Sequence, residues 1–521
     1  RRLYFILFFV SLVKPFYWDD NGIPIRQGMH IEWMRTGDIS SDGDFIYSWS
    51  DTRNSDRDIY VQKLDSQGNK LWPEDAIAVS FEGRQEDPQL VSDGNGGAFL
   101  IWNDYRLEPN NFADPPAQLY AQHVNSDGQI SWSITGVALG SLDKSQVGIN
   151  ICKDGIGGAY AIWSEVDNQV VKTYATHMTA VGVLNPEVGT VIIQLDHSYS
   201  IGMSLETASD GDAVMAWKDS RNGDSNTDIY AQRISLNQDG NIETLWPDDG
   251  FPLCTAEGNQ SSPRVAPYND VYSIIAWEDS RNSNTFPILS KDIYAQFIDV
   301  NGGIPEAYNN DGNAVAIYPF DQSKPRVKSN SSGAYIIWGD LRQGIDDVFI
   351  QRITPDLSTG YFDRDGSLQG WNNCDAQYIL EDGFCVDGAP VSDLMDSRSQ
   401  EEARLTTDDN GVWVVYEDQI PDDIPSLDIL AQNFNESGVP AFENGGISVS
   451  SANYSQEAPI IQADGDGGVF AIWQDRRDGS TAIYTQYVSS MGIQLAINGL
   501  ELNSGIDWDG GLVDDEYNNF N

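Results

Sequence analysis

The sequence predicts an all-β protein: a β-propeller of four-stranded blades, with eight blades, or seven as the alternative. Three observations support this fold class. One short phrase recurs along the chain, each copy holds four short apolar runs separated by turn residues, and long stretches with helical period are absent. The 48 glycines suit a chain with many tight turns.

The recurring phrase is centred on a tryptophan, as in "AWKDSRNGDSNTDIYAQRI", which begins at Ala216. Its position in eight successive copies is taken by Trp49, Trp102, Trp163, Trp217, Trp277, Trp338, Tyr416 and Trp473. A catalytic site usually occurs once in a chain. A phrase that returns along the whole sequence therefore indicates a unit of construction.

The second copy shows how one unit is built. "PQLVSDGNGGAFLIW" is an apolar run, a glycine-rich turn and a second apolar run, which predicts a β-hairpin. "AQLYAQHV" adds a third run and "TGVALG" a fourth. Such a small sheet cannot shield both of its faces alone, so we expect the copies to pack radially around a common axis. A parallel β-helix fits less well, because its rungs are shorter and lack hairpin turns.

Nine stretches match the fourth, outermost strand of a blade, one more than eight blades need. They are residues 23–26, 76–79, 137–139, 191–195, 251–254, 314–317, 384–386, 447–449 and 500–502. The extra strand lies in "GIPIRQG" near the N-terminus or in "GLELN" near the C-terminus. By pairing across the seam it would close the ring and hide open sheet edges.

The chain divides into three parts. Residues 1–16 hold a basic pair followed by an apolar run, the layout of a signal peptide or an N-terminal hydrophobic segment. Residues 17–505 carry the repeats, and residues 506–521 form an acidic tail or a linker to a further C-terminal domain. We therefore expect a protein that is secreted, extracellular or on the outer cell surface. No other stretch is a transmembrane candidate.

The composition limits the classes of molecule that we expect the protein to bind. The chain carries 79 acidic and 30 basic residues, for a net charge of −49, and has no basic stretch long enough to follow a phosphate backbone. Nucleic acid is therefore excluded as an expected partner, and anionic membranes are repelled. The oligomeric state stays open.

In the pattern Trp-x-Asp-x-Arg the three residues alternate, so on a strand they point to one face. The Trp can fill the space between blades, and the Asp–Arg pair can form a charge-assisted tie to the next loop. The pairs are Asp51/Arg53, Asp104/Arg106, Asp219/Arg221, Asp279/Arg281, Asp340/Arg342 and Asp475/Arg477. Six near-identical pairs favour scaffolding over catalysis. These twelve residues are also the candidate binding residues, and no catalytic residue is predicted.

A second recurring residue is a glutamine just before the first strand of a copy, often with Pro three residues later, as in "QEDP", "QSSP" and "QSKP". These glutamines are Gln85, Gln146, Gln260, Gln322, Gln400 and Gln456. An amide there can satisfy backbone groups of the adjacent blade, so the role is structural first. The loops after the Arg, such as "LEPNNFADPPAQ" and "NSNTFPILSK", lie on the same face and mark it as a candidate binding face.

Cysteine and histidine give weak signals. Cys374 and Cys385 bracket an irregular insertion, where a disulfide is possible in an oxidising compartment, whereas Cys152 and Cys254 fit buried free thiols. The four histidines have no metal-ligand spacing, and His123 and His177 take variable third-strand positions that we expect to be exposed.

Metal and cofactor signals are similarly weak. Acidic turns such as "ADGDGG" make weak calcium binding possible, although they lack the distal Glu of an EF-hand loop. No other cofactor is predicted.

The repeats "DGNGGAFLIWNDYR" with "LYAQHVNSDGQISW", and "AWKDSRNGDSNTDIYAQRI", resemble those of large secreted bacterial β-propeller proteins. The resemblance covers about residues 17–505 and implies export, in many such proteins as cargo of the type IX secretion system with a C-terminal sorting domain, which is not recognisable here. The function of that family is poorly defined. The resemblance implies a binding or structural module for glycans or surface proteins, and it supplies no catalytic residues.

Two enzymatic alternatives remain. "KLDSQGNKLW" is similar to the turn-and-Trp motif of eight-bladed pyrroloquinoline quinone dehydrogenases, but adjacent cysteines are absent and the Trp is lost after "VNGGIPEAY". A sialidase-like glycosidase is the second alternative, although the spacing in "SDGNGGAFLIW" does not fit the Ser-x-Asp-x-Gly-x-x-Trp box. A buried carboxylate cluster near the ring's axis would favour catalysis.

Overall fold

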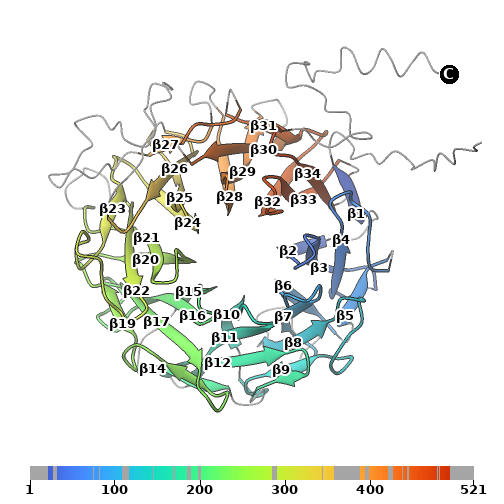
Figure 1. The fold of residues 1–521 in the computed structure, drawn as a ribbon, viewed down its shortest axis with the longest axis horizontal. Helices are drawn as coiled ribbons and strands as arrows, with labels where there is room; N and C mark the ends of the chain where they lie inside the picture. The colour runs from blue at the N-terminus through green and yellow to red at the C-terminus, as the bar shows by residue number, and fades with distance from the viewer. Residues whose placement is uncertain are drawn as a thin grey trace, which may run out of the picture.

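The computed structural model consists of sheets arranged around one axis (Figure 1). It describes residues 22–26, 32–54, 56–73, 75–80, 83–107, 117–144, 146–167, 170–184, 189–196, 201–283, 290–342, 344–356, 388–392, 398–420, 426–436, 438–442, 445–477, 479 and 481–492. All the regular secondary structure in these residues is β-strand. The predicted signal segment (1–16), the tail (506–521) and Cys374 and Cys385 lie outside them.

The strands form eight antiparallel sheets, which confirms the eight-bladed β-propeller. Blade 1 is β2 (Glu32–Ile39), β3 (Phe45–Asp51), β4 (Asp58–Leu64) and β5 (Ile77–Ser80). Blade 2 is β6 (Gln85–Ser92), β7 (Ala98–Asp104), β8 (Gln118–Val124) and β9 (Val137–Leu139). Blade 3 is β10 (Gln146–Lys153), β11 (Gly158–Asp167), β12 (Val170–Thr179), β13 (Gly182–Val183) and β14 (Thr190–Asp196). Blade 4 is β15 (Ile201–Thr207), β16 (Ala213–Asp219), β17 (Asp228–Leu236), β18 (Ile242–Thr244) and β19 (Phe251–Cys254).

The second half of the ring repeats this plan. Blade 5 is β20 (Gln260–Pro267), β21 (Tyr272–Asp279), β22 (Asp292–Asp299) and β23 (Asn313–Ala316). Blade 6 is β24 (Gln322–Asn330), β25 (Gly333–Asp340), β26 (Asp347–Ile353) and β27 (Ala389–Pro390). Blade 7 is β28 (Gln400–Asp408), β29 (Gly411–Ile420), β30 (Ser426–Asn435) and β31 (Ile447–Ser450). Blade 8 is β32 (Gln456–Ala463), β33 (Val469–Asp475), β34 (Ala482–Val488) and β1 (Ile23–Arg26).

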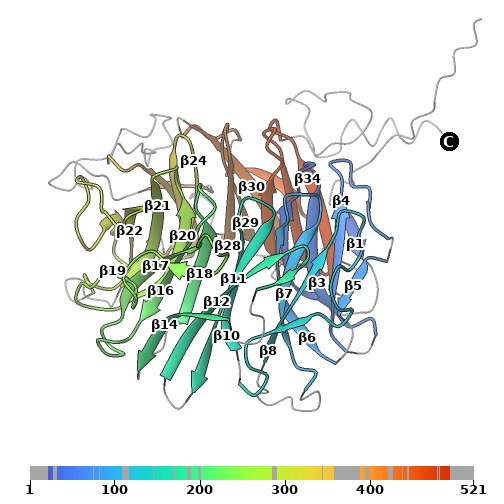
Figure 2. The same cartoon turned by 60° about the horizontal axis from the view of Figure 1, so that its bottom comes forward.

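The first strand of each blade lies nearest the axis, as β20, β24 and β28 do in Figure 1. Figure 2 shows the blades side by side, with their strands running between the two faces of the ring. Both sheet faces are covered by neighbouring blades, so the second strands are almost wholly buried. All seven repeat tryptophans and Tyr416 lie in this core.

The ring is closed by the N-terminal strand. β1 pairs antiparallel with β34, and Figure 1 shows the blue β1 beside the red β34. This confirms the first of the two closures that the sequence allowed. The second candidate, residues 500–502, lies outside the described residues, as does the predicted strand at 384–386, whose place beside β26 is taken by β27.

A glycine before the outer strand marks the same position in several blades. A Cβ on Gly312 would lie 2.3 Å from the indole of Trp277, and one on Gly22 would lie 2.4 Å from the indole of Trp473. Both glycines have positive φ, which other residues rarely adopt. Gly22 therefore docks β1 onto blade 8 in the way that Gly312 docks β23 onto blade 5.

The recurring glutamines connect neighbouring blades, as the sequence predicts. The Gln260 backbone N–H donates to the Thr227 carbonyl of the preceding blade at 2.8 Å, and Gln322 donates to the Lys291 carbonyl at 2.8 Å. The side-chain amides bond mainly within their own loop; that of Gln322 donates to the Phe320 carbonyl at 2.9 Å. The side chain makes the expected link in blade 3, where Gln146 Oε1 accepts the Leu119 backbone N–H of blade 2 at 2.9 Å, whereas in blades 5 and 6 the glutamine backbone makes it.

Candidate functional site

The Trp-x-Asp-x-Arg residues form a buried tie in each of six blades. In blade 5 the Trp277 indole N–H donates to Asp279 at 2.9 Å, and Arg281 donates to both oxygens of the same carboxylate at 2.9 and 2.6 Å. The guanidinium lies 4.0 Å from the centre of the Tyr294 ring. The carboxylate is fully buried, so its acceptor sites are used inside the protein.

These ties also reach the preceding blade. Arg106 donates to the Ser80 hydroxyl at 3.1 Å, and Arg477 to the Ser450 hydroxyl at 3.3 Å. The twelve candidate residues are therefore spread around the ring as six separate clusters, each held by its own blade. They do not meet in one pocket.

The arginines of these ties, which the sequence offered as candidate binding residues, are turned inward. The Arg342 side chain is only 2% exposed and donates to Asp340 at 2.6 Å, with its guanidinium 4.0 Å from the centre of the Phe349 ring. The Arg53 side chain is 11% exposed, donates to Asp51 at 2.8 Å and lies 3.6 Å from the centre of the Tyr60 ring.

The structure places the twelve candidate residues in these ties, and a binding role for them stays a prediction. Arg53 donates through Nε and both terminal nitrogens inside its blade, and Arg342 donates to Asp340 and lies over the Phe349 ring, so a ligand could reach these groups only by breaking those contacts. The same inward ion pair is formed by Asp104/Arg106, Asp219/Arg221, Asp279/Arg281 and Asp475/Arg477. The pairs Asp51/Arg53 and Asp340/Arg342, like these four, are parts of the scaffold.

Two blades depart from the motif. In blade 3 Glu165 takes the place of Asp and accepts the Trp163 indole N–H at 3.4 Å. In blade 7 Arg398, from the loop before β28, donates to Asp418 at 2.6 Å. The sequence pattern did not reveal this replacement arginine.

A second aspartate lies directly opposite the first on the third strand. Asp279 pairs with Asp292 in register, as Asp418 does with Asp428. Burial, with the neighbouring carboxylate adding to it, raises the pKa of Asp292 to about 7 and that of Asp428 to about 6. Each blade of this kind holds two acids and one arginine, so one acid lacks a full counter-charge.

The expectation that His123 and His177 are exposed is wrong. His123 Nε2 lies 2.8 Å from Asp93, and His177 Nε2 lies 2.8 Å from Asp154, with both imidazoles buried. Although burial raises the pKa of Asp93, its hydrogen bonds from His123 and from two backbone N–H groups outweigh this and leave the pKa lowered. The sequence pattern missed these pairs because the hairpin-turn aspartate and the third-strand histidine are far apart in the chain.

The two cysteines within the described residues are buried free thiols, as predicted. Burial raises the pKa of Cys254 to about 12 and that of Cys152 further. In this part of the chain no group of three His, Cys, Asp or Glu side chains is arranged to hold a metal ion. In "ADGDGG", Asp464 accepts two backbone N–H groups and the Tyr487 hydroxyl. Calcium binding stays a prediction.

Three arginines from consecutive blades form what we call the axial arginine cluster. Arg264 on β20, Arg326 on β24 and Arg404 on β28 take the same position, four residues after Gln260, Gln322 and Gln400. All three are half-buried on the strands nearest the axis. The arginines are the last residues of "QSSPR", "QSKPR" and "QEEAR" in the sequence. The repeat pattern drew attention only to the Gln and Pro of these stretches.

The cluster is short of negative charge. Arg404 lies 3.2 Å from Glu402, but among the described residues Arg264 and Arg326 have no carboxylate within ion-pair distance. Burial and the charge of Arg404 lower the pKa of both Arg264 and Arg326, and Arg264 adds to the effect on Arg326. The guanidinium groups stay charged at neutral pH, so this position is suited to an anion.

The lysines near the axis, in contrast, are paired with carboxylates. Lys153 of blade 3 lies 3.2 Å from Asp38 of blade 1, and Lys328 of blade 6 lies 2.8 Å from Glu206 of blade 4. Lys324 lies 3.4 Å from Glu402. The paired carboxylates leave Arg264 and Arg326 as the unneutralised cations in this part of the described chain.

Two exposed aromatic residues precede the inner strands of blades 6 and 8. Phe320 and Tyr454 lie two residues before Gln322 and Gln456 and are 44% and 61% exposed. Their φ values are 76° and 66°, a region that costs bulky residues energy, and blades 2 and 5 have glycine there. Strained, exposed side chains of this kind concentrate at binding sites.

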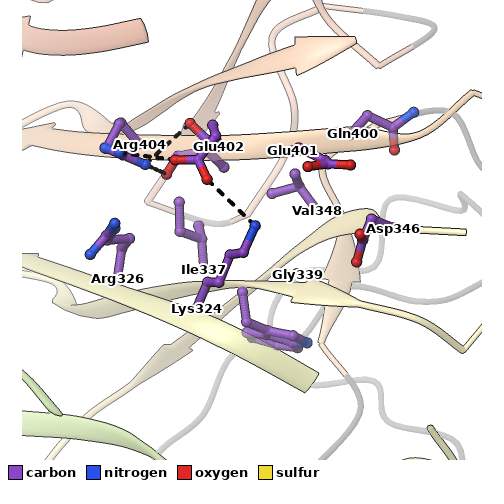
Figure 3. A pocket seen from close by; sticks show the side chains of 12 residues that line it. Lys324, Arg326, Ile337, Gly339, Asp346, Val348, Gln400, Glu401, Glu402 and Arg404 are labelled. Carbon is purple, nitrogen blue, oxygen red and sulfur yellow. Dashed lines mark hydrogen bonds and ion pairs between the residues drawn. The ribbon is translucent and has the colours of Figure 1, made fainter. Parts of the chain in front are cut away.

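A small cavity lies beside the cluster, between blades 6 and 7. Figure 3 shows Arg326, Arg404 and Glu402 at one end and Asp346 and Glu401 at the other, with Lys324 between β24 and β28. Its volume is about 30 Å³, enough for one or two water molecules. The floor is formed by β25 at Gly339.

Comparisons with known proteins locate only distant likenesses. No family model and no curated protein matches the chain. A structure described as an ulvan lyase of polysaccharide lyase family PL25 is 10% identical, with a TM-score of 0.40, over 91% of this chain and 96% of its own. The polysaccharide lyase Uly1 is 9% identical, with a TM-score of 0.41, over 76% and 88%.

A protein of unknown function from Dyadobacter fermentans is 10% identical, with a TM-score of 0.34, over 63% of this chain and 96% of its own. Function must therefore be argued from this chain's own residues. Across the described ranges, no helix is long and apolar enough to cross a membrane.

Proposed function

We propose that the protein is a secreted or cell-surface binding module whose axial arginine cluster takes an acidic glycan. The observation that carries the proposal is the pair of guanidinium groups, Arg264 and Arg326, that lack a carboxylate partner in the described part of a chain with a net charge of −49. A guanidinium presents two parallel N–H donors to a carboxylate or sulfate. An anionic ligand supplies the negative charge that the fold does not place beside Arg264 and Arg326.

A glycan suits the cluster better than a folded protein partner. The arginines are half-buried on the innermost strands. A narrow chain with a charged substituent suits half-buried groups better than a convex protein surface does. Phe320 and Tyr454 offer exposed apolar faces near the start of the inner strands, suited to the apolar side of a sugar ring. The acidic outer surface repels polyanions elsewhere, which directs an acidic glycan to this position.

Binding is favoured over the enzymatic alternatives by the state of the axial carboxylates. A glycosidase needs two carboxyl groups that can exchange protons or attack the sugar. Among the described residues, Glu402, Glu206 and Asp38 are each tied to a lysine. A quinone-dependent dehydrogenase is supported by no residue of this cluster.

The test is a screen of acidic and neutral oligosaccharides, followed by calorimetric titration of the best ligand. We expect uronate-containing or sulfated glycans to bind and neutral ones not to bind. Arg326→Gln should weaken binding at least tenfold, because a charge-assisted hydrogen bond is worth about 1.5–3 kcal/mol. Arg476→Gln, which removes an exposed arginine paired with Glu457, is the matched control and should change affinity less than about threefold. Equal binding of neutral and acidic glycans would contradict the proposal.

A further inference from the structure

The residue directly after the repeat tryptophan, or after Tyr416 in blade 7, reaches the next blade in blades 5 and 7. In blades 5 to 8 it is Glu278, Gly339, Glu417 and Gln474. Glu278 reaches across from blade 5 and accepts the Lys324 backbone N–H of blade 6 at 2.9 Å. Glu417 reaches across from blade 7 and accepts the Ala458 backbone N–H of blade 8. A carboxylate therefore fills this position at two interfaces.

The backbone donor is the same position in each inner strand. Lys324, Glu402 and Ala458 come two residues after Gln322, Gln400 and Gln456, and their φ values are 55°, 47° and 51°. In all three strands the pairing with the second strand shifts register at this point. The bulge leaves the residue out of the β-ladder and frees its N–H for the neighbouring blade.

At the interface between blades 6 and 7 the donor is Glu402, but the residue opposite it is Gly339. Steric crowding does not require a glycine there. A Cβ on Gly339 would have its nearest neighbours at 3.7–3.9 Å, which is ordinary contact, and its φ is not positive. The missing side chain leaves the cavity of about 30 Å³ described above, lined by Lys324, Arg326 and Glu402.

We propose that the cavity opposite Gly339 is a subsite for one carboxylate of the bound glycan, which takes the place that Glu278 and Glu417 fill at the other two interfaces. The carboxylate accepts the Glu402 backbone N–H and lies close to the cations of Lys324 and Arg326. The inference rests on the proposed function, because the carboxylate belongs to the acidic glycan. It specifies the ligand as a uronic acid polymer, since the cavity is too small for a sugar ring.

The charges around the cavity orient the ligand. Arg326 and Arg404 of the axial arginine cluster lie at one end of the cavity, which we call the inner end, Lys324 lies between β24 and β28, and Asp346 and Glu401 lie at the opposite, outer end (Figure 3). The outer carboxylates repel an anion and the inner cations attract it. The uronate therefore enters from the side of the axial arginine cluster, with the rest of the glycan held by Arg264 and its neighbours.

The test replaces the missing side chain. Gly339→Glu supplies an internal carboxylate, so we expect a folded protein with an unchanged or higher melting temperature and an affinity for oligogalacturonate at least tenfold lower. Gly339→Gln fills the same volume without charge and should also weaken binding. Gly339→Ala adds only a Cβ that the cavity admits, and is the matched control with less than threefold change.

The outcomes separate the two proposals. If the wild-type protein binds no acidic glycan, the proposed function fails. If it binds, and Arg326→Gln weakens binding while Gly339→Glu does not, the subsite alone is overturned. Preference for a sulfated glycan without uronate would also overturn the subsite.

A measurement on the wild-type protein covers the case in which the variants do not fold. In protein labelled with 15N-glutamate, the Glu402 amide resonance, assigned by its loss in Glu402→Gln, should shift on titration with glucuronate and not with glucose. An unshifted resonance would overturn the inference.

Discussion

Asp292 offers the most direct test of how the blades balance their buried charges. Its carboxylate is fully buried opposite Asp279, accepts one hydrogen bond from Asn282 at 2.9 Å, and leaves its second oxygen without a partner. Asp292→Asn keeps an oxygen for Asn282 and removes the charge. We therefore expect the variant to be more stable than the wild type at alkaline pH.

The size of the effect follows from the pKa. Burial and Asp279 raise the pKa of Asp292 from 3.8 to about 7. Because the folded protein holds this proton more tightly than the unfolded chain, the contribution of Asp292 to stability is most favourable below pH 4 and is lost as the pH rises through 7. One pKa unit corresponds to about 1.4 kcal/mol, so the gain from Asp292→Asn is roughly 4 kcal/mol at pH 8 and roughly 2 kcal/mol at pH 5.

The assay is reversible denaturation in urea at pH 5 and pH 8, with the variant compared to the wild type at each pH. The exposed Asp270→Asn is the control and should change the free energy of unfolding by less than about 0.5 kcal/mol. A gain that is equal at both pH values, or a variant that is less stable at pH 8, would refute the reasoning.

Three further predictions concern the framework. Gly22→Ala should lower the free energy of unfolding by about 2–4 kcal/mol, because the added Cβ overlaps the Trp473 indole. Gly43→Ala, also at positive φ but with open space around it, should lower it by about 1–2 kcal/mol. Equal losses in urea denaturation would contradict the docking of β1. Gln232→Met removes the donor to the Pro247 carbonyl and the acceptor of the Arg233 and Trp246 N–H groups, and should cost about 2–3 kcal/mol in the same assay, with no loss counting against this role. Cys152 and Cys254 should resist iodoacetamide at pH 8 until the protein is denatured, because burial raises the pKa of Cys254 to about 12; peptide mapping that finds them alkylated in the native protein would show that the blades open.

The fold could be predicted from the sequence because the same pattern of strands and turns recurs in every blade. Each Trp lies on the second strand of its blade, and the outer strands at 137–139 and 251–254 match in full. The closing strand at residues 23–26 could also be predicted, because the sequence holds nine candidates for the outer strand of eight blades. Period and turn chemistry set these features locally, so no knowledge of distant contacts was needed.

The candidate site was harder to predict because it depends on differences between copies. Arg264, Arg326 and Arg404 are far apart in the chain and meet only when blades 5, 6 and 7 are placed side by side. Gly339 has meaning only beside Glu278 and Glu417, and the His123–Asp93 pair only once the hairpin folds back on the third strand. The repeated residues drew attention to the scaffold, whereas the function proposed here lies in the departures from the repeat.

The pairing of β1 with β34 has a consequence for synthesis. Of the described strands, β1 is made first and its partner β34 is made last. Blades 1 to 7 can collapse in order on local contacts, while blade 8 must wait with an exposed edge. Pairing β1 with β34 thus completes the ring, and until it occurs the open ring is vulnerable to strand exchange with another copy of the chain.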